Sequence, residues 1–134
     1  MNTIKYKKLN LQEGDTLLDM GCGEGRHSIG ALLETSANVI GLDLSRNDLS
    51  TAKSRLKDFD ISDLQNSCNF GVANINDIPI ENSKLDAVMC SEVLEHIDSP
   101  QESIEELIRV LKPGGVLALS VPRYLPELIC WKLS

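Results

Sequence analysis

The stretch LLDMGCGEGRHS, residues 17–28, has three glycines within five positions, directly after an apolar run that contains one acid. The run at residues 16–20 is typical of a short buried strand, and a helix is expected at residues 25–35. Glycine allows a backbone to turn sharply and to approach a ligand closely, because it has no Cβ. A strand, a glycine loop and a helix in this order predict a ligand-binding turn at the carboxyl end of a parallel strand.

Four further apolar runs and two amphipathic segments alternate along the rest of the chain. Strands are expected at residues 37–43, 68–75, 85–90 and 116–121, and helices at residues 46–59 and 100–111. Strands that alternate with amphipathic helices are typical of a parallel sheet with helices on both faces. The sequence therefore predicts an α/β fold.

Several polar residues are expected to have structural roles. Ser45 with Asp48, and Ser99 with Glu102, have the spacing of caps at the start of a helix. Asp86, inside the strand expected at residues 85–90, is interpreted as making a structural hydrogen bond to a neighbouring loop. None of these five residues is needed to explain a binding site.

The composition argues against several classes of protein. The chain has 134 residues, the length of one domain, and its formal net charge of −7 disfavours electrostatic binding to nucleic acids or anionic membranes. The first ten residues lack the apolar core of a signal peptide, and no apolar run approaches the roughly 20 residues of a membrane span. The four cysteines lack CxxC spacing and are expected to be reduced, mostly buried thiols of a cytoplasmic protein: Cys22, Cys68, Cys90 and Cys130.

Two acids distinguish the glycine loop from a dinucleotide-binding loop. The dinucleotide fingerprint is GxGxxG, whereas the spacing here is GxGxG, with Arg26 at the place of the last glycine. Asp19 lies two residues before the first glycine, where it suits a cationic group better than a pyrophosphate. Asp43 ends the second strand, where an acid accepts hydrogen bonds from ribose hydroxyls. Although such glycines alone also form simple turns, the combination predicts a positively charged nucleoside without phosphates as the ligand.

The loop is one of five stretches that together resemble a known family. In chain order they are LLDMGCGEGRHS, VIGLDLS, NINDIPI, LDAVMCSEVLEHI and RVLKPGGVLALSVP. They resemble the successive motifs of class I S-adenosylmethionine-dependent methyltransferases, and most closely the small-molecule, type 11-like subgroup with a VLEH element. The resemblance runs from about residue 11 to residue 122. It implies an enzyme that moves a methyl group to an O, N or C nucleophile of a small-molecule acceptor.

The resemblance assigns cofactor-binding roles to particular residues. It places Asp19 and the loop backbone at the methionine part of S-adenosylmethionine, Asp43 at the ribose, and Asn74 beside adenine. The family often has Asp at the position of Asn74, but an amide oxygen still accepts from the adenine amino group. The full set of expected cofactor-binding residues is Asp19, Gly21, Cys22, Gly23, Gly25, Asp43, Leu44, Asn74, Ile75 and Ser91.

The segment SEVLEHI, residues 91–97, contains the spacing E-x-x-E-H. On a helical turn Glu92, Glu95 and His96 share a face, and two carboxylates with an imidazole could hold a divalent metal such as Mg²⁺. The alternative is that no metal binds and that His96 lines the substrate cleft as a base or a local hydrogen-bonding group. We take His96 as the candidate base and Glu92 as the group that orients it or binds a metal.

The resemblance also sets an expectation for the end of the sheet. Members of the family normally have seven strands, with a last antiparallel hairpin at the outer edge of the fifth. Residues 123–134 contain too much proline to continue the fifth strand, and no hairpin follows it before residue 134. We expect these residues to begin a substrate-covering segment; the alternative is an amphipathic segment that contacts a membrane or a partner. The predicted fold is thus a Rossmann-like doubly wound parallel sheet of about five strands, with helices on both faces and without the final antiparallel hairpin. Residues 1–134 are expected to form a single domain, truncated at its C-terminus.

Two other functions stay open from the sequence. A non-catalytic S-adenosylmethionine-binding remnant, or pseudoenzyme, that needs a partner chain fits the expected missing strands, because an uncovered apolar edge at VLALSV invites pairing. A dinucleotide-dependent oxidoreductase fits poorly, because the glycine spacing is wrong. The acceptor and the oligomeric state stay open as well.

Overall fold

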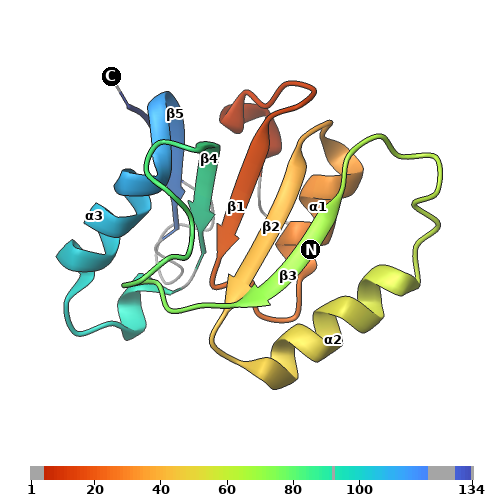
Figure 1. The fold of residues 1–134 in the computed structure, drawn as a ribbon, viewed down its shortest axis with the longest axis horizontal. Helices are drawn as coiled ribbons and strands as arrows, with labels where there is room; N and C mark the ends of the chain where they lie inside the picture. Colours follow the sequence, from red (N-terminus) through yellow and green to blue (C-terminus); the bar gives the residue numbers. More distant parts are fainter. Residues whose placement is uncertain (1–4, 92, 121–128, 134) are drawn as a thin grey trace.

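The computed structural model describes residues 5–91, 93–120 and 129–133. Its centre is a six-stranded sheet in the order β3-β2-β1-β4-β5-β6 (Figure 1). Strands β1 to β5 run parallel, and β6 runs antiparallel to β5. The bounds are β1 Thr16–Met20, β2 Asn38–Asp43, β3 Cys68–Val72, β4 Leu85–Cys90, β5 Leu111–Leu119 and β6 Ile129–Lys132.

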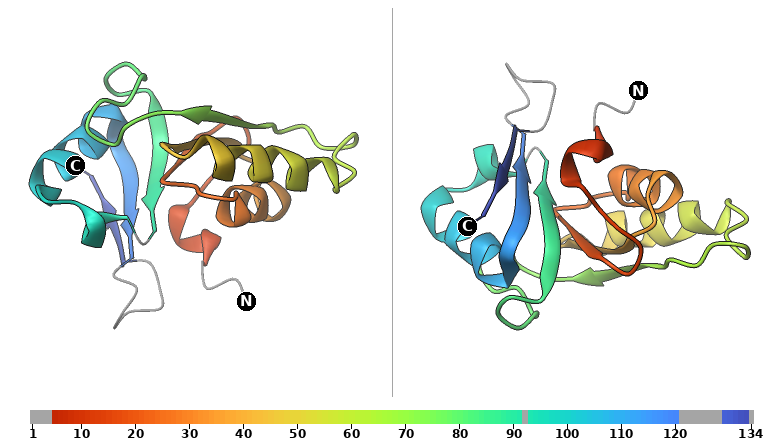
Figure 2. Two further views of the ribbon diagram at one scale, coloured as in Figure 1. Left: turned by 90° about the horizontal axis from the view of Figure 1, so that it is seen from below. Right: turned by 90° about the horizontal axis from the view of Figure 1, so that it is seen from above.

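The described residues also form three α-helices and two short 3-10 helices. Their bounds are η1 Tyr6–Leu9, α1 Arg26–Glu34, α2 Arg46–Lys57, η2 Leu94–His96 and α3 Pro100–Val110. Figure 2 shows α3 on one side of the sheet and α1 with α2 on the other. None of the helices in this described part is long and apolar enough to cross a bilayer.

The two faces of the sheet carry separate cores, because successive side chains of a strand point to opposite faces. In β1, Leu17 packs among buried residues of α1 and η1, whereas Leu18 packs among buried residues of α3. The same alternation holds in β4, where Ala87 and Val88 belong to different cores. The prediction of a sheet with helices on both faces is confirmed.

The final antiparallel strand is present, and the expectation that the sheet lacks it is wrong. Residues 129–132 pair along β5 from Val116↔Lys132 to Leu119↔Ile129, and the Leu133 amide donates to the Gly115 carbonyl at 2.8 Å. Pro122 and Pro126 hid this strand in the sequence, but both precede it, and two of its four residues, Ile129 and Trp131, are of types enriched in strands. The sheet therefore has six strands, with the outer edge of β5 covered.

The structure places two further boundaries differently from the sequence. Helix α3 ends at Val110, and β5 begins at Leu111, ahead of the Pro-Gly-Gly sequence at residues 113–115, whereas the strand was expected to begin at residue 116. Ser99 occupies the cap position of α3, but its side chain makes no capping hydrogen bond. The other predicted cap is confirmed, since the Asp48 amide donates to Ser45 Oγ at 3.1 Å.

Asp86 of β4 has the structural role predicted for it. Its carboxylate accepts a hydrogen bond from the Thr16 amide at 2.8 Å and pairs with Lys112 Nζ at 3.1 Å. The partner is the first residue of β1 rather than a loop.

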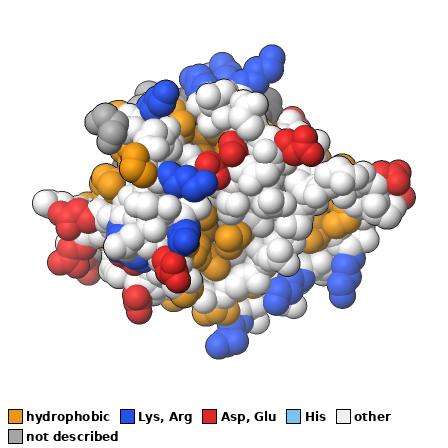
Figure 3. Space-filling model, turned by 45° about the horizontal axis from the view of Figure 1, so that its top comes forward, with side chains coloured by type: hydrophobic (Ala, Val, Ile, Leu, Met, Phe, Trp, Pro, Cys, Tyr) orange, Lys and Arg blue, Asp and Glu red, His pale blue; other side chains and the backbone are white. Residues whose placement is uncertain are grey.

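On the face in Figure 3, Lys and Arg side chains are interspersed with Asp and Glu side chains. This mixed distribution gives that face no single sign of charge.

An ion pair on α3 anchors the loop that follows β3. Arg109 donates from Nε and Nη2 to the two carboxylate oxygens of Glu106, at 2.7 and 2.9 Å. The same guanidinium donates to the Ile78 and Ile80 carbonyls at 2.9 Å each and to Asn82 Oδ1 at 2.8 Å. Glu106 in turn accepts from the Ile78 amide at 2.7 Å. The loop is thus held to α3 by charged groups.

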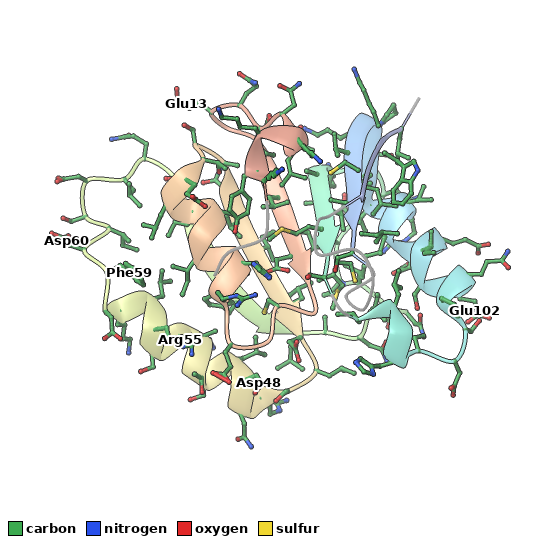
Figure 4. All side chains as sticks on the ribbon, turned by 180° about the vertical axis from the view of Figure 1, so that it is seen from behind. Glu13, Asp48, Arg55, Phe59, Asp60 and Glu102 are labelled. Atoms are coloured by element: carbon green, nitrogen blue, oxygen red, sulfur yellow. The ribbon has the colours of Figure 1, made fainter. Side chains whose placement is uncertain are left out.

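Arg109→Ala is expected to lower the free energy of unfolding by about 2 kcal/mol, because it removes several charge-assisted hydrogen bonds and leaves Glu106 without its cation. Urea unfolding at neutral pH measures this change. Arg55→Ala is the matched control: Arg55 lies on α2 (Figure 4) and pairs with Glu24 at 3.3 Å, with both side chains about half exposed. Such a pair is worth roughly 0.5 kcal/mol. Equal losses in the two variants would contradict the assigned role of Arg109.

Candidate functional site

The carboxyl ends of the parallel strands meet at one edge of the sheet, the lower edge in Figure 1. There β1 leads into the loop at residues 21–25, β2 ends at Asp43, and Ser91 and Ser120 follow β4 and β5. The strand order changes direction between β1 and β4. Ligands of open α/β sheets bind at such a switch point, so this edge is the candidate site.

Backbone hydrogen bonds hold the glycine loop against the end of β2. The Gly21 and Cys22 amides both donate to the Leu42 carbonyl, at 2.7 and 3.0 Å. The Gly25 amide donates to the Cys22 carbonyl at 3.0 Å and closes the turn. The loop is therefore fixed by its own main chain and by the neighbouring strand.

Two of the loop glycines are required by close approach as well as by backbone conformation. Gly21 has φ +76°, and a Cβ there would overlap Val93 Cγ2. Gly25 has φ +86°, and its Cβ would lie 2.8 Å from Ala52 Cβ of α2. Gly23, by contrast, has nothing within 4 Å of its Cβ position. The middle of the loop thus presents bare backbone to open space, as the approach of a ligand requires.

Asp43 links the glycine loop to the start of α2. Its Oδ2 accepts from the Gly23 amide and its Oδ1 from the Ser45 amide, each at 2.8 Å. Each carboxylate oxygen therefore already accepts one hydrogen bond from a main-chain amide. Leu44, the next residue, is 64% exposed and offers an apolar surface beside this carboxylate.

Asp19 lies at the end of β1 and is buried, with 1% of its surface exposed. Its Oδ2 accepts a hydrogen bond from the Ser28 hydroxyl at 2.6 Å. Burial raises the pKa of Asp19 to about 6; the Ser28 hydrogen bond opposes this rise, and the nearby charge of Asp43 adds to it. Because burial disfavours the charged form of this carboxyl group, a cation placed beside it would favour that form.

The two predicted cofactor-binding residues in the segment after β3 differ in their exposure to solvent. Asn74 is exposed, and its Oδ1 accepts from the Asn76 amide at 2.9 Å. Ile75 is 7% exposed and packs in the core on the α3 side of the sheet. Val72, at the end of β3, is 43% exposed and lies on the same segment.

The segment after β4 is described in part. Ser91 Oγ lies 3.1 Å from Ser120 Oγ, which joins the ends of β4 and β5. His96 is exposed and ends the short helix η2. Glu92 lies outside the described residues, and the side chain of Glu95 does too. The proposed metal triad is therefore not tested by the structure.

Sequence reasoning missed three residues of this region: Ser28, Val93 and Ser120. Ser28 lies in the quoted stretch, and only the fold brings its hydroxyl to Asp19. Ser120 had a local signal, because it directly follows an apolar run, as Ser91 does. Val93 had none, since its contact with Gly21 joins segments about 70 residues apart.

Comparison with known proteins identifies the family. Residues 11–134 match the protein family described as "Methyltransferase domain". The chain belongs to this methyltransferase family. With its Rossmann-like fold it is a class I S-adenosylmethionine-dependent methyltransferase domain.

Individual relatives agree with this assignment. The chain is 37% identical over 112 residues to a demethylmenaquinone methyltransferase of Oceanobacillus iheyensis, a match that covers 81% of this chain and 45% of the relative. It is 30% identical over 115 residues to the methyltransferase GfsG of Streptomyces halstedii, covering 86% and 40%. The methyltransferase domain thus spans less than half the length of these relatives.

A solved structure gives the same result for the fold. Phosphoethanolamine N-methyltransferase 2 of Haemonchus contortus, in complex with S-adenosyl-L-methionine, superposes with a TM-score of 0.74 at 27% identity. The match covers 85% of this methyltransferase domain and 26% of that chain.

Asp19→Asn is expected to stabilise the domain at neutral pH. Because the folded-state pKa of Asp19 is raised to about 6 from 3.8, its contribution to stability is fully present below pH 3.8 and is lost as pH rises through 6. An amide does not titrate, so the variant gains on the wild type across this window by up to about 3 kcal/mol.

Urea unfolding of both proteins at pH 4, 5, 6 and 7 measures this difference. Asp63→Asn is the control, because Asp63 is exposed and its substitution is expected to change stability by less than about 0.5 kcal/mol at every pH. If the difference in unfolding free energy between Asp19→Asn and wild type does not grow between pH 4 and pH 6, burial does not raise the pKa of Asp19.

Proposed function

We propose that this domain binds S-adenosylmethionine at the edge formed by the glycine loop, Asp19 and Asp43, and that it transfers the methyl group to a small-molecule acceptor. The observation that carries the proposal is the position of the Asp43 carboxylate. It accepts a hydrogen bond from the Gly23 amide of the loop, and the next residue in the chain is the exposed Leu44. One residue thereby brings together a loop for the amino-acid part, an acceptor for ribose and an apolar surface for adenine.

The described residues suit each part of this cofactor. A carboxylate can accept about four hydrogen bonds, so Asp43 retains capacity for two ribose hydroxyls after binding two amides. The buried Asp19 suits the positively charged ammonium or sulfonium group. Gly21, Cys22, Gly23 and Gly25 would wrap the methionine part, and Leu44, Asn74 and Ile75 would border adenine.

When bound, S-adenosylmethionine supplies a methyl group that its positively charged sulfur activates for attack by an O, N or C nucleophile. The chain's own residues then have to orient the acceptor and exclude water. His96 is the proposed base and Glu92 its orienting group, with Ser91 lining the cleft. Support comes from Val93, which packs on Gly21 and so fixes the segment of His96 beside the cofactor loop.

The printed name of the demethylmenaquinone methyltransferase supports a small organic molecule as acceptor class. Residues 123–134 are proposed to contribute to covering that acceptor, and residues 129–132 of this segment form β6. Nucleic acid is not proposed as a substrate, because the net charge of −7 repels phosphates.

A second candidate is a cofactor-binding module that needs a partner chain for turnover. The matches cover 40% and 45% of the relatives compared above, so turnover by this chain alone is a separate question from cofactor binding. Both candidates require cofactor binding, and they differ in whether this chain alone turns over an acceptor.

Asp43→Asn is expected to weaken binding of S-adenosylhomocysteine at least tenfold. The variant loses a charged acceptor, and its amide nitrogen cannot accept the Gly23 or ribose hydrogen bond. Calorimetric titration of wild type, Asp43→Asn and the surface control Asp63→Asn measures the dissociation constants. NAD is expected not to bind. Binding of NAD in place of S-adenosylhomocysteine would refute the proposal.

His96→Ala is expected to lower kcat about 100-fold while leaving the affinity for S-adenosylhomocysteine unchanged, because a base acts on the acceptor and not on the cofactor. Methyl transfer to a panel of phenols, hydroquinones and amines measures it. Each assay is run after chelation and again with added Mg²⁺, so that a requirement for metal at Glu92, Glu95 and His96 is seen directly. Full turnover by His96→Ala would remove His96 as the base, and binding by the wild type without any turnover would favour the second candidate.

A further inference from the structure

Three elements bring Asp19, Ser28 and Gly41 into one buried cluster. Asp19 is the second-last residue of β1, Ser28 lies in the first turn of α1, and Gly41 lies in β2. Ser28 is fully buried, and its hydroxyl donates to Asp19 Oδ2 at 2.6 Å. A Cβ at Gly41 would lie 2.6 Å from the Phe70 ring and 2.9 Å from Ser28 Oγ, so the absence of a side chain in β2 leaves room for both groups.

We propose that Ser28 is a positioning residue: its buried hydroxyl, donating to Asp19 Oδ2, orients the Asp19 carboxylate and favours its charged form, as the cationic cofactor requires. This inference rests on the proposed function, because it assigns Ser28 a role in cofactor affinity. Ser28 has no contact with solvent and acts through Asp19 alone.

The physical reason is the large free-energy cost of burying a charge. Removal from water favours the neutral acid, and a hydrogen bond donated to the carboxylate favours the charged form. At Asp19 burial is the larger effect, and the Ser28 hydrogen bond is the main influence that opposes it. A neutral Asp19 would no longer attract an ammonium or sulfonium group.

The electrostatic surroundings of Asp19 among the described residues consist of one acid and three thiols. Asp43 on β2 is the charged residue acting on it among the described residues. The charge of Asp19 acts on three thiols: Cys22 in the loop, Cys68 in β3 and Cys90 in β4. Burial raises the pKa of Cys68 and Cys90 to about 12 and raises that of Cys22 as well, so all three stay neutral. Cofactor affinity should therefore fall as pH drops through 6.

Ser28→Ala tests the proposal, with Ser103→Ala as the matched control. Ser103 on α3 is also fully buried, and its hydroxyl also donates at 2.6 Å, but to Asn76 rather than to Asp19. Two quantities are measured in each protein: the pH midpoint of the Asp19 side-chain ¹³C carboxyl resonance by NMR without ligand, and the dissociation constant of S-adenosylhomocysteine at pH 6 and pH 8. S-adenosylhomocysteine is a suitable probe because it carries the ammonium group of the cofactor.

Loss of one charge-assisted hydrogen bond should raise the midpoint of Asp19 by about one pH unit in Ser28→Ala, and Ser103→Ala should not change it. Because the affinity scales with the ionised fraction, Ser28→Ala should then bind about fivefold more weakly than wild type at pH 6 and within twofold of it at pH 8. Recovery at the higher pH is the signature that a merely structural defect would lack.

An unchanged midpoint in Ser28→Ala, or a loss of affinity that is equal at both pH values, would overturn the proposal. If Ser28→Ala does not fold, Ser28→Cys replaces it, because a thiol is a weak donor of similar size and should move the midpoint in the same direction. If no protein binds the probe at either pH, the proposed function fails, while the ligand-free NMR midpoints still decide whether Ser28 controls the charge of Asp19.

Discussion

The connection between the glycine loop and the end of β2 is the constraint on which the site depends. Two loop amides share the Leu42 carbonyl, and the next one along the loop binds the Asp43 carboxylate. These bonds set where α1 begins, because Gly25 is the residue that precedes it. They also draw the loop over the end of β1, where Asp19 is buried. Moving the loop would therefore change the helix, the carboxylate and the ligand surface together.

Burial of Asp19 is a case of function opposing stability. A carboxyl group whose pKa is raised by burial makes the folded state less stable at neutral pH than a neutral side chain would. The sequence nevertheless has an acid there, together with a glycine in β2 that makes room for a serine hydroxyl against it. Local departures from the most stable packing are expected at functional sites. The cluster of Asp19, Ser28 and Gly41 has this character.

Much of the fold follows from local sequence signals. β1 and β4 have the predicted bounds, and the Ser45 cap forms as predicted, because these features depend on short apolar runs and on residues three positions apart. The sequence misled where pairing partners are distant. β6 is short and follows two prolines, and what stabilises it is the edge of β5. Likewise β5 starts at Leu111 because it pairs with Leu85, and the Pro-Gly-Gly signal does not prevent this. For the site, the acids and glycines were visible in the sequence, whereas Ser28 required the fold.

The two halves of the candidate site are held in different ways. On the side of β1 and β2, main-chain amides and two carboxylates fix the loop that faces the amino-acid and ribose parts of the proposed cofactor. On the side of β3, the loop after Asn74 is fastened to α3 by the Arg109 guanidinium and Glu106. These anchors share no residue. Changes in one half should therefore add to changes in the other, as expected for groups without a common partner. The adenine side can then vary through α3 while the glycine loop, Asp19 of β1 and Asp43 of β2 stay in place.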